Sequence, residues 1–156
     1  MSVASPSNSA KQRSLILDRF APYRIVALGH AVSGRLSQVY ADENITIPEW
    51  RVLAVISQVD SLAARDVVER TPMDKMTVSR TVASLETKDL VLRTQDKQDR
   101  RVNMLSLSAA GRILFNRVAA LALQFEDELL AVLSPGEQSA FEATLLKLEA
   151  RAKAAG

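Results

Sequence analysis

Residues 96–101, with the sequence DKQDRR, place six charged or polar side chains between two short apolar runs. Asp99 lies two residues before Arg101, a spacing at which a carboxylate can hold a guanidinium in one orientation. A guanidinium held in this way suits a narrow minor groove of DNA, where negative potential is concentrated. The simpler interpretation is a solvated turn with a surface ion pair worth about 0–1 kcal/mol. The segment alone leaves both interpretations open.

The residues upstream of this segment form a second surface of the same chemical character. Val78, Val82 and Leu85 recur at i, i+4 and i+7, so they share one helical face that we expect to be buried. Arg80 is the best candidate for reading a guanine edge, because a guanidinium donates two parallel hydrogen bonds. Lys75 lies in the first turn of this helix, at a level where it can reach a DNA phosphate. The face opposite the apolar one carries small, polar and cationic side chains that can enter a groove: Met76, Thr77, Arg80, Ser84 and Thr87.

The composition excludes several classes of protein. The chain has 156 residues, a length typical of one domain, and 47% of them are hydrophobic, enough to bury a core. It has no cysteine and a single histidine, His30, which argues against thiol chemistry, a cysteine zinc site and a multi-histidine metal site. No nucleotide-binding or metalloprotease motif is present, so we expect no catalytic residues, no metal and no cofactor. The sequence also shows no signal peptide and no membrane-spanning run, which predicts a cytoplasmic protein.

The distribution of charge matters more than the net charge of +2. Residues 62–112 contain ten lysines and arginines against seven acidic residues, whereas the remainder contains ten basic and eleven acidic residues. The basic excess therefore lies in the middle third, as expected if that part faces a polyanion.

Apolar periodicity predicts the elements that position these residues. A tail at residues 1–14 precedes a long amphipathic helix over residues 15–40. Thr46 as N-cap, with Pro48 and Glu49 in the first turn, begins a second helix. A short third helix is expected over residues 61–71 and a fourth after the N-cap Asp74. Two strands then enclose the charged segment as a two-stranded hairpin.

Two further helices complete the predicted order. One begins near Ser108, and the last begins at a capping box in which Ser134 is followed three residues later by Glu137, with Pro135 at the first helical position. The last helix extends to about Lys153 and places Phe141, Leu145, Leu148 and Ala152 on one stripe. The expected fold class is mainly α with a small β-hairpin wing (α+β), a winged helix-turn-helix flanked by long terminal helices.

From about Leu62 to Gly111 the chain resembles the MarR family of bacterial transcription regulators. The segment MTVSRTVASLETKDLVLR resembles that family's recognition helix and first wing strand, DKQDRR its wing tip, and LSLSAAG the start of its next helix. The family usually has glycine where this chain has Asp89; aspartate tolerates the left-handed backbone expected there, so we expect the turn to be kept. The long helices before and after these motifs also fit in order and length.

Residues 1–14, rich in serine and alanine, are expected to be a mobile tail, and residues 15–156 a single MarR-like domain. Residues 15–45 and 112–156 would be dimerisation helices, and residues 46–111 the DNA-binding lobe. The resemblance further implies a homodimer on a pseudo-palindromic operator in double-stranded DNA, most simply as a repressor that a small ligand releases. Within the wing tip, Arg101 would enter the minor groove beside Asp99, and Arg100 would meet a phosphate. A monomer whose terminal helices cover its own lobe is the alternative arrangement.

Members of this family often bind a small anionic, commonly aromatic, effector between the dimer helices and the DNA-binding lobe. His30 lies on nearly the same helical face as two hydroxyls, although a lone histidine is more often a structural residue. The effector candidates are His30, Ser33, Ser37, Trp50, Arg51 and Phe115. The alternative function is a dimeric small-molecule binding protein whose winged lobe no longer reads DNA specifically.

Overall fold

A computed structural model describes residues 14–154, so nearly all of the predicted tail lies outside the described residues. The chain divides into two compact units, one ending at Arg35 and one beginning at Leu36. The helices, with 3-10 helices written η, are η1 (Leu17–Arg19), α1 (Ala21–Val39), η2 (Ala41–Glu43), α2 (Ile47–Ser57), α3 (Ala64–Arg70), α4 (Lys75–Thr87), α5 (Ala109–Leu130) and α6 (Pro135–Ala154). The strands are β1 (Leu62–Ala63), β2 (Val91–Gln95) and β3 (Asn103–Leu107). The mainly helical fold with a small β wing is confirmed.

The first unit contains η1 and the part of α1 up to Arg35. The helix predicted over residues 15–40 is confirmed in substance, but it begins only at Ala21, after the separate turn η1. The large apolar side chains of this unit are exposed, among them Phe20, Tyr23, Ile25, Val26 and Leu28.

Side chains in the second unit begin its helices as the sequence predicts. The Thr46 hydroxyl accepts from the Glu49 backbone N–H, while the Glu49 carboxylate accepts from the Thr46 N–H, which completes a capping box at α2. Asp74 caps α4 through the Thr77 N–H, at 2.7 Å. The predicted capping box of Ser134 and Glu137 is present at α6. These local bonds satisfy N–H groups that the helices leave free.

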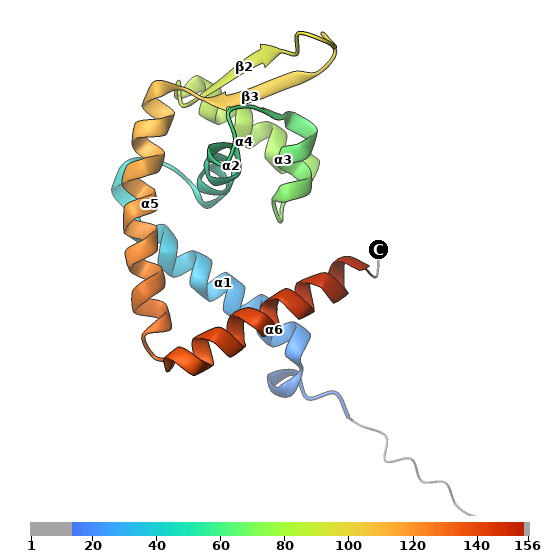
Figure 1. Ribbon diagram of the computed structural model, residues 1–156, viewed down its shortest axis with the longest axis vertical. Coiled ribbons are helices and arrows are strands. Elements are labelled where there is room, and N and C mark those ends of the chain that lie inside the picture. The colour runs from blue at the N-terminus through green and yellow to red at the C-terminus, as the bar shows by residue number, and fades with distance from the viewer. Residues whose placement is uncertain (1–13, 155–156) are drawn as a thin grey trace, which may run out of the picture. The chain divides into compact units, whose positions relative to one another are not determined.

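The sheet differs from the predicted two-stranded hairpin. β2 and β3 pair antiparallel as expected, but β3 also pairs with β1, so the strand order is β1-β3-β2. The sequence predicts Leu62 and Ala63 in the third helix, but they form β1 and the helix begins at Ala64. A strand of two residues carries no periodic signal of its own, since its conformation depends on the pairing of Leu62 with Leu105. In Figure 1 the β2–β3 hairpin, called the wing below, extends past α2, α3 and α4.

The core of the second unit lies where α2, α4 and the sheet meet. The apolar face predicted for α4 is confirmed, because Val78, Val82 and Leu85 are all buried. Its core partners come from every other element of the lobe and from α5: Val52, Leu53, Ile56, Leu62, Val67, Leu90, Val91, Leu105, Leu114 and Val118. One face of α4 is therefore fixed, which leaves the other available.

The turn after α4 is joined closely to the start of α5. Asp89 has φ 58°, so the left-handed conformation predicted there is confirmed. The Ser108 hydroxyl donates to the Asp89 carbonyl at 2.6 Å, and the Ser108 N–H donates to the Leu90 carbonyl at 3.0 Å. A Cβ at Gly111 would lie 2.0 Å from the Leu90 carbonyl oxygen, so only glycine fits this approach.

Helix α6 exposes apolar side chains along its length. Phe141, Leu145 and Leu148 form the predicted stripe, and each remains 39–49% exposed. Leu146, Leu123 in α5 and Val132 in the turn between α5 and α6 are exposed as well. No helix in residues 14–154 is long and apolar enough to cross a membrane.

Candidate nucleic-acid interface

Helices α3 and α4, joined by residues 71–74, form a helix-turn-helix whose second helix presents an open face. Lys75, Met76 and Arg80 are exposed on α4, as predicted, and so is Ser79. Within the described residues no hydrogen bond or ion pair holds the Arg80 guanidinium. An unpaired guanidinium on an exposed helix can donate both of its parallel hydrogen bonds to a base edge or a phosphate.

Two hydroxyls predicted to face DNA instead donate hydrogen bonds to carboxylates of the protein itself. The Thr77 hydroxyl donates to the Asp74 carboxylate at 3.0 Å as part of the cap. These contacts, the Thr77 N–H foremost, hold the pKa of Asp74 below its usual range, so it stays charged. Ser84 is half-buried, and its hydroxyl donates to Glu49 Oε1 at 2.7 Å. Its partner lies 35 positions away in the chain, so helical spacing alone gave no sign of this bond.

Glu49 fixes the C-terminal end of α4 to the beginning of α2. Its carboxylate is 3% exposed and accepts from the Lys88 ammonium (2.9 Å), the Ser84 hydroxyl and the Thr46 N–H. Lys88 also donates to the Asn44 carbonyl. Burial raises the pKa of Glu49, but these hydrogen bonds outweigh it and the net pKa is lowered. The sequence pattern indicates Glu49 only as a helix-start residue and carries no sign of this tertiary role.

The wing tip, residues 96–101, contains two aspartate-to-backbone hydrogen bonds and exposed cations. Asp99 Oδ1 accepts from the Arg101 backbone N–H at 3.0 Å, and Asp96 Oδ1 accepts from the Gln98 N–H at 3.1 Å. The prediction that the Asp99 carboxylate holds the Arg101 guanidinium is therefore wrong: among residues 14–154 no ion pair joins these side chains. The two-residue spacing instead forms an Asx turn, in which aspartate bonds to the backbone two positions on. Arg100 and Arg101 are exposed.

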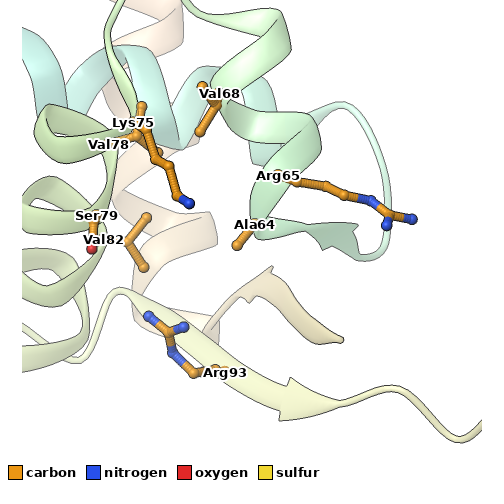
Figure 2. Close-up of a pocket in the computed structure, with 8 residues that line it drawn as sticks. All are labelled: Ala64, Arg65, Val68, Lys75, Val78, Ser79, Val82 and Arg93. Atoms are coloured by element: carbon orange, nitrogen blue, oxygen red, sulfur yellow. The ribbon is translucent and has the colours of Figure 1, made fainter. Parts of the chain in front are cut away.

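A hollow of about 180 Å³ lies between α3, α4 and β2. Ala64, Val68, Val78 and Val82 give it an apolar floor. Figure 2 shows Lys75 and Arg93 pointing toward the hollow from opposite sides, whereas Arg65 projects away from it. The Arg93 guanidinium is paired with the Glu86 carboxylate at 2.8 and 3.1 Å. Arg65 and Arg93 were not among the predicted site residues, although both belong to the basic excess of the middle third.

Three aromatic rings cluster in the second unit. The Trp50 ring stacks on Phe115 with centroids 5.6 Å apart, and the Tyr40 ring lies 5.7 Å from Trp50. Burial raises the pKa of Tyr40, and the charge of Arg51 partly offsets that rise. The structure thus brings together Trp50 and Phe115, two predicted effector residues. Tyr40 was not among the predicted effector residues. Its aromatic side chain could have indicated it, because only 4% of the residues in this chain are aromatic.

The other predicted effector residues lie on α1. His30 and Ser33 belong to the first unit, whereas Ser37 belongs to the second. His30 is exposed, and Ser33 and Ser37 are half-buried and have interaction partners. The effector role of all six residues stays a prediction.

Comparison with known proteins identifies this lobe. The model described as "MarR family" matches residues 43–102. The HTH-type transcriptional repressor MdtR of Bacillus subtilis (strain 168) is 31% identical over 94 residues, which are 60% of this chain and 61% of MdtR, so the chain spans less than two thirds of that relative. A MarR family transcriptional regulator from Silicibacter pomeroyi is 27% identical with a TM-score of 0.76, over 89% of this chain and 96% of that one. A MarR/EmrR family regulator from Acinetobacter sp. ADP1 is 26% identical with a TM-score of 0.80, over 89% and 99%. Residues 43–102 thus match the MarR family, and the chain is similar in fold and sequence to regulators of that family.

Proposed function

We propose that this protein is a homodimeric transcriptional regulator that binds double-stranded DNA sequence-specifically and represses until a small anionic effector releases it. The observation that carries the proposal is the open face of α4, where Arg80 is exposed and unpaired among the described residues, beside a wing tip that exposes Arg100 and Arg101. Such a helix fits the major groove, and such a tip reaches the adjacent minor groove or phosphates. The name of the relative MdtR, a transcriptional repressor, supports the sign of regulation.

Two arginines have different roles in this proposal. Arg80 reads a base edge, so Arg80→Ala should cost about 1–3 kcal/mol of binding and relax preference at one base position. Arg101 interacts with the minor groove and its potential, so Arg101→Ala should weaken binding to all sequences more evenly. Arg151→Ala is the matched control, because it replaces an arginine in the last turn of α6, outside the proposed DNA contacts. This variant should bind DNA like the parent.

The test begins with the operator. DNA fragments that the purified protein retains from its own genome are sequenced, and the affinity for the enriched sequence is measured against a scrambled duplex at several salt concentrations. Specific binding should weaken with salt at a log-log slope of about −0.9 per phosphate contacted. Equal affinity of the parent and both variants for enriched and scrambled DNA would favour the alternative, a small-molecule binding protein that does not read sequence.

The effector proposal is supported by the rings of Tyr40, Trp50 and Phe115, with Arg51 close enough to Tyr40 to affect its pKa. A flat anion fits an aromatic surface beside a cation. Trp50 is the only tryptophan, so its fluorescence reports on this cluster directly. Benzoate and 4-hydroxybenzoate serve as probes, and binding should change the Trp50 emission and lower the affinity for operator DNA, because the two effects are linked. A His30→Ala protein that releases DNA at the parent's probe concentration would remove His30 from the effector site.

A further inference from the structure

The first turn of α4 exposes one large apolar side chain among cations and capping groups. Met76 is 67% exposed, with Lys75 before it and the capping pair of Asp74 and Thr77 on either side. Single exposed apolar residues are common on protein surfaces and need no explanation. Met76 differs because it lies on the open face of the helix that also carries Arg80.

The exposed positions of α4 follow one stripe. Met76, Arg80 and Ala83 are spaced i, i+4 and i+7, which places them in a row on one helical face, and all three are exposed. Three of the hydroxyls that flank this row donate to groups of the protein itself, from Thr77 to Asp74, from Ser84 to Glu49 and from Thr87 to the Ala83 carbonyl, whereas Ser79 is exposed beside the row. The row therefore presents an apolar group, a guanidinium and a methyl group, in that order.

The major groove offers a single apolar feature, the 5-methyl group of thymine. We infer that Met76 reads a thymine methyl group near the guanine that Arg80 contacts. Ala83 lies on the other side of Arg80 in the row. Its side chain is a methyl group, which can neither donate nor accept a hydrogen bond. The inference rests on the proposed function and adds to it a base composition for the operator half-site.

The helix geometry limits how far apart the two bases lie. Residues four apart differ by about 6 Å along a helix axis, and stacked base pairs lie about 3.4 Å apart. The thymine read by Met76 should therefore lie about two base-pair steps from the guanine read by Arg80. A methionine side chain is flexible and adapts to a methyl surface without a fixed geometry, so it adds to affinity at this position rather than to a hydrogen-bond pattern.

The test removes the methyl group from the DNA instead of the protein. Each thymine of the enriched half-site is replaced in turn by deoxyuridine, which keeps every hydrogen-bonding group, and affinity is measured by fluorescence anisotropy. One replacement, about two steps from the guanine that Arg80→Ala identifies, should weaken the parent about fourfold, the amount expected for one buried methyl group. Met76→Ala should weaken binding to thymine DNA by a similar or larger factor and be insensitive to that replacement. Met76→Leu should remain sensitive.

Ser79→Ala is the matched control, because it changes a neighbouring exposed residue of α4 to the same alanine, and it should keep the parent's sensitivity to deoxyuridine at that position. We expect Met76→Ala to keep the helix, since alanine favours helices and the Met76 side chain is not part of the core. A parent that binds all deoxyuridine duplexes equally, or a Met76→Ala variant that keeps the fourfold loss, would overturn the inference and leave the proposed function intact. Absence of any enriched operator would instead overturn the proposed function.

Discussion

The two-residue spacing of Asp99 and Arg101 correctly predicted a contact between these residues but not the group of Arg101 that makes it. The Asp99 carboxylate accepts the Arg101 backbone N–H, so it shapes the loop that carries the guanidinium and does not hold the guanidinium itself. An asparagine can accept the same bond, since both residues form Asx turns. An aspartate near DNA phosphates also adds a repulsive charge, which asparagine removes.

We therefore expect Asp99→Asn to bind operator DNA at least as tightly as the parent and Asp99→Ala to bind it several-fold more weakly, because only alanine loses the acceptor that orders the loop. Anisotropy titrations with one operator duplex measure both affinities. Thermal unfolding should stay unchanged in both variants, since the loop is exposed. If asparagine proved as damaging as alanine, the carboxylate charge would be the important feature and the Asx turn would not.

Gly111 is a second residue with a local requirement. A Cβ there would lie 2.0 Å from the Leu90 carbonyl oxygen, and that atom is backbone that cannot turn aside. We expect Gly111→Ala to lower the free energy of unfolding by about 1–3 kcal/mol, as overpacking does. Gly136→Ala is the control: a Cβ at that helical position meets nothing within 4 Å and should be neutral or slightly stabilising. Urea unfolding of both variants checks this, and equal stability of the two would contradict the close approach.

At the scale of elements, α4 is fixed at one end and open at the other. Its C-terminal end is joined to α2 through Glu49, and the turn after it is joined to α5 through Ser108 and Gly111. Its N-terminal half carries Met76 and Arg80 on an exposed face. We therefore expect a shift in α2 or α5 to displace the helix that we propose reads DNA.

Two ion pairs of this region allow a direct comparison of burial. Lys88 neutralises Glu49, which is 3% exposed, whereas Arg93 pairs with Glu86 near the surface. Removal of one partner from a buried pair leaves a buried charge, so we expect Lys88→Met to cost about 2–4 kcal/mol of stability, somewhat below the full range because the Lys88 side chain is 29% exposed. Arg93→Met should cost about 0–1 kcal/mol. Urea unfolding at neutral pH measures both, and similar losses would show that Glu49 is solvated in solution.

The same carboxylate gives a pH dependence with a defined sign. The pKa of Glu49 is lowered in the folded protein, because the hydrogen bonds from Ser84, Lys88 and Thr46 outweigh its burial. Its contribution to stability is therefore present above the unfolded pKa of about 4.3 and is lost as the pH falls through the lower folded pKa. We expect Glu49→Gln to be less stable than the parent at pH 7 but to lose less stability between about pH 5 and pH 3. Parallel pH profiles of the two proteins would contradict this assignment.

The sequence predicted those elements whose signals are local. Asp74 and the row Val78, Val82 and Leu85 located α4 and its buried face, and the charged segment located the wing tip. Strand β1 could not be predicted, because Leu62 and Ala63 become a strand only by pairing with β3. The role of Ser84 was missed for the same reason, since its acceptor is brought close only by the packing of α2 on α4. Tertiary contacts, and not local propensity, decided both.

At the scale of the whole molecule, the apolar surface of α6 requires an explanation. Phe141, Leu145 and Leu148 form one exposed stripe, and contiguous apolar surface of this kind marks an interface. A second copy of the chain is the partner that the proposed function requires, because two symmetric lobes would meet the two halves of a pseudo-palindromic operator about one helical turn of DNA apart.

The proposed dimer can be tested together with its effect on DNA binding. Leu145→Glu places a charge in the stripe and should shift the protein from dimer to monomer in sedimentation velocity, whereas Ala143→Glu adds the same charge on the opposite side of α6 and should leave the dimer intact. Because one lobe contacts about half as many phosphates, the log-log salt slope of the monomer should be about half that of the parent. The control should keep the full slope. A Leu145→Glu protein that sediments as a dimer, or a monomer with the full slope, would show that the α6 stripe does not join the two DNA-binding lobes.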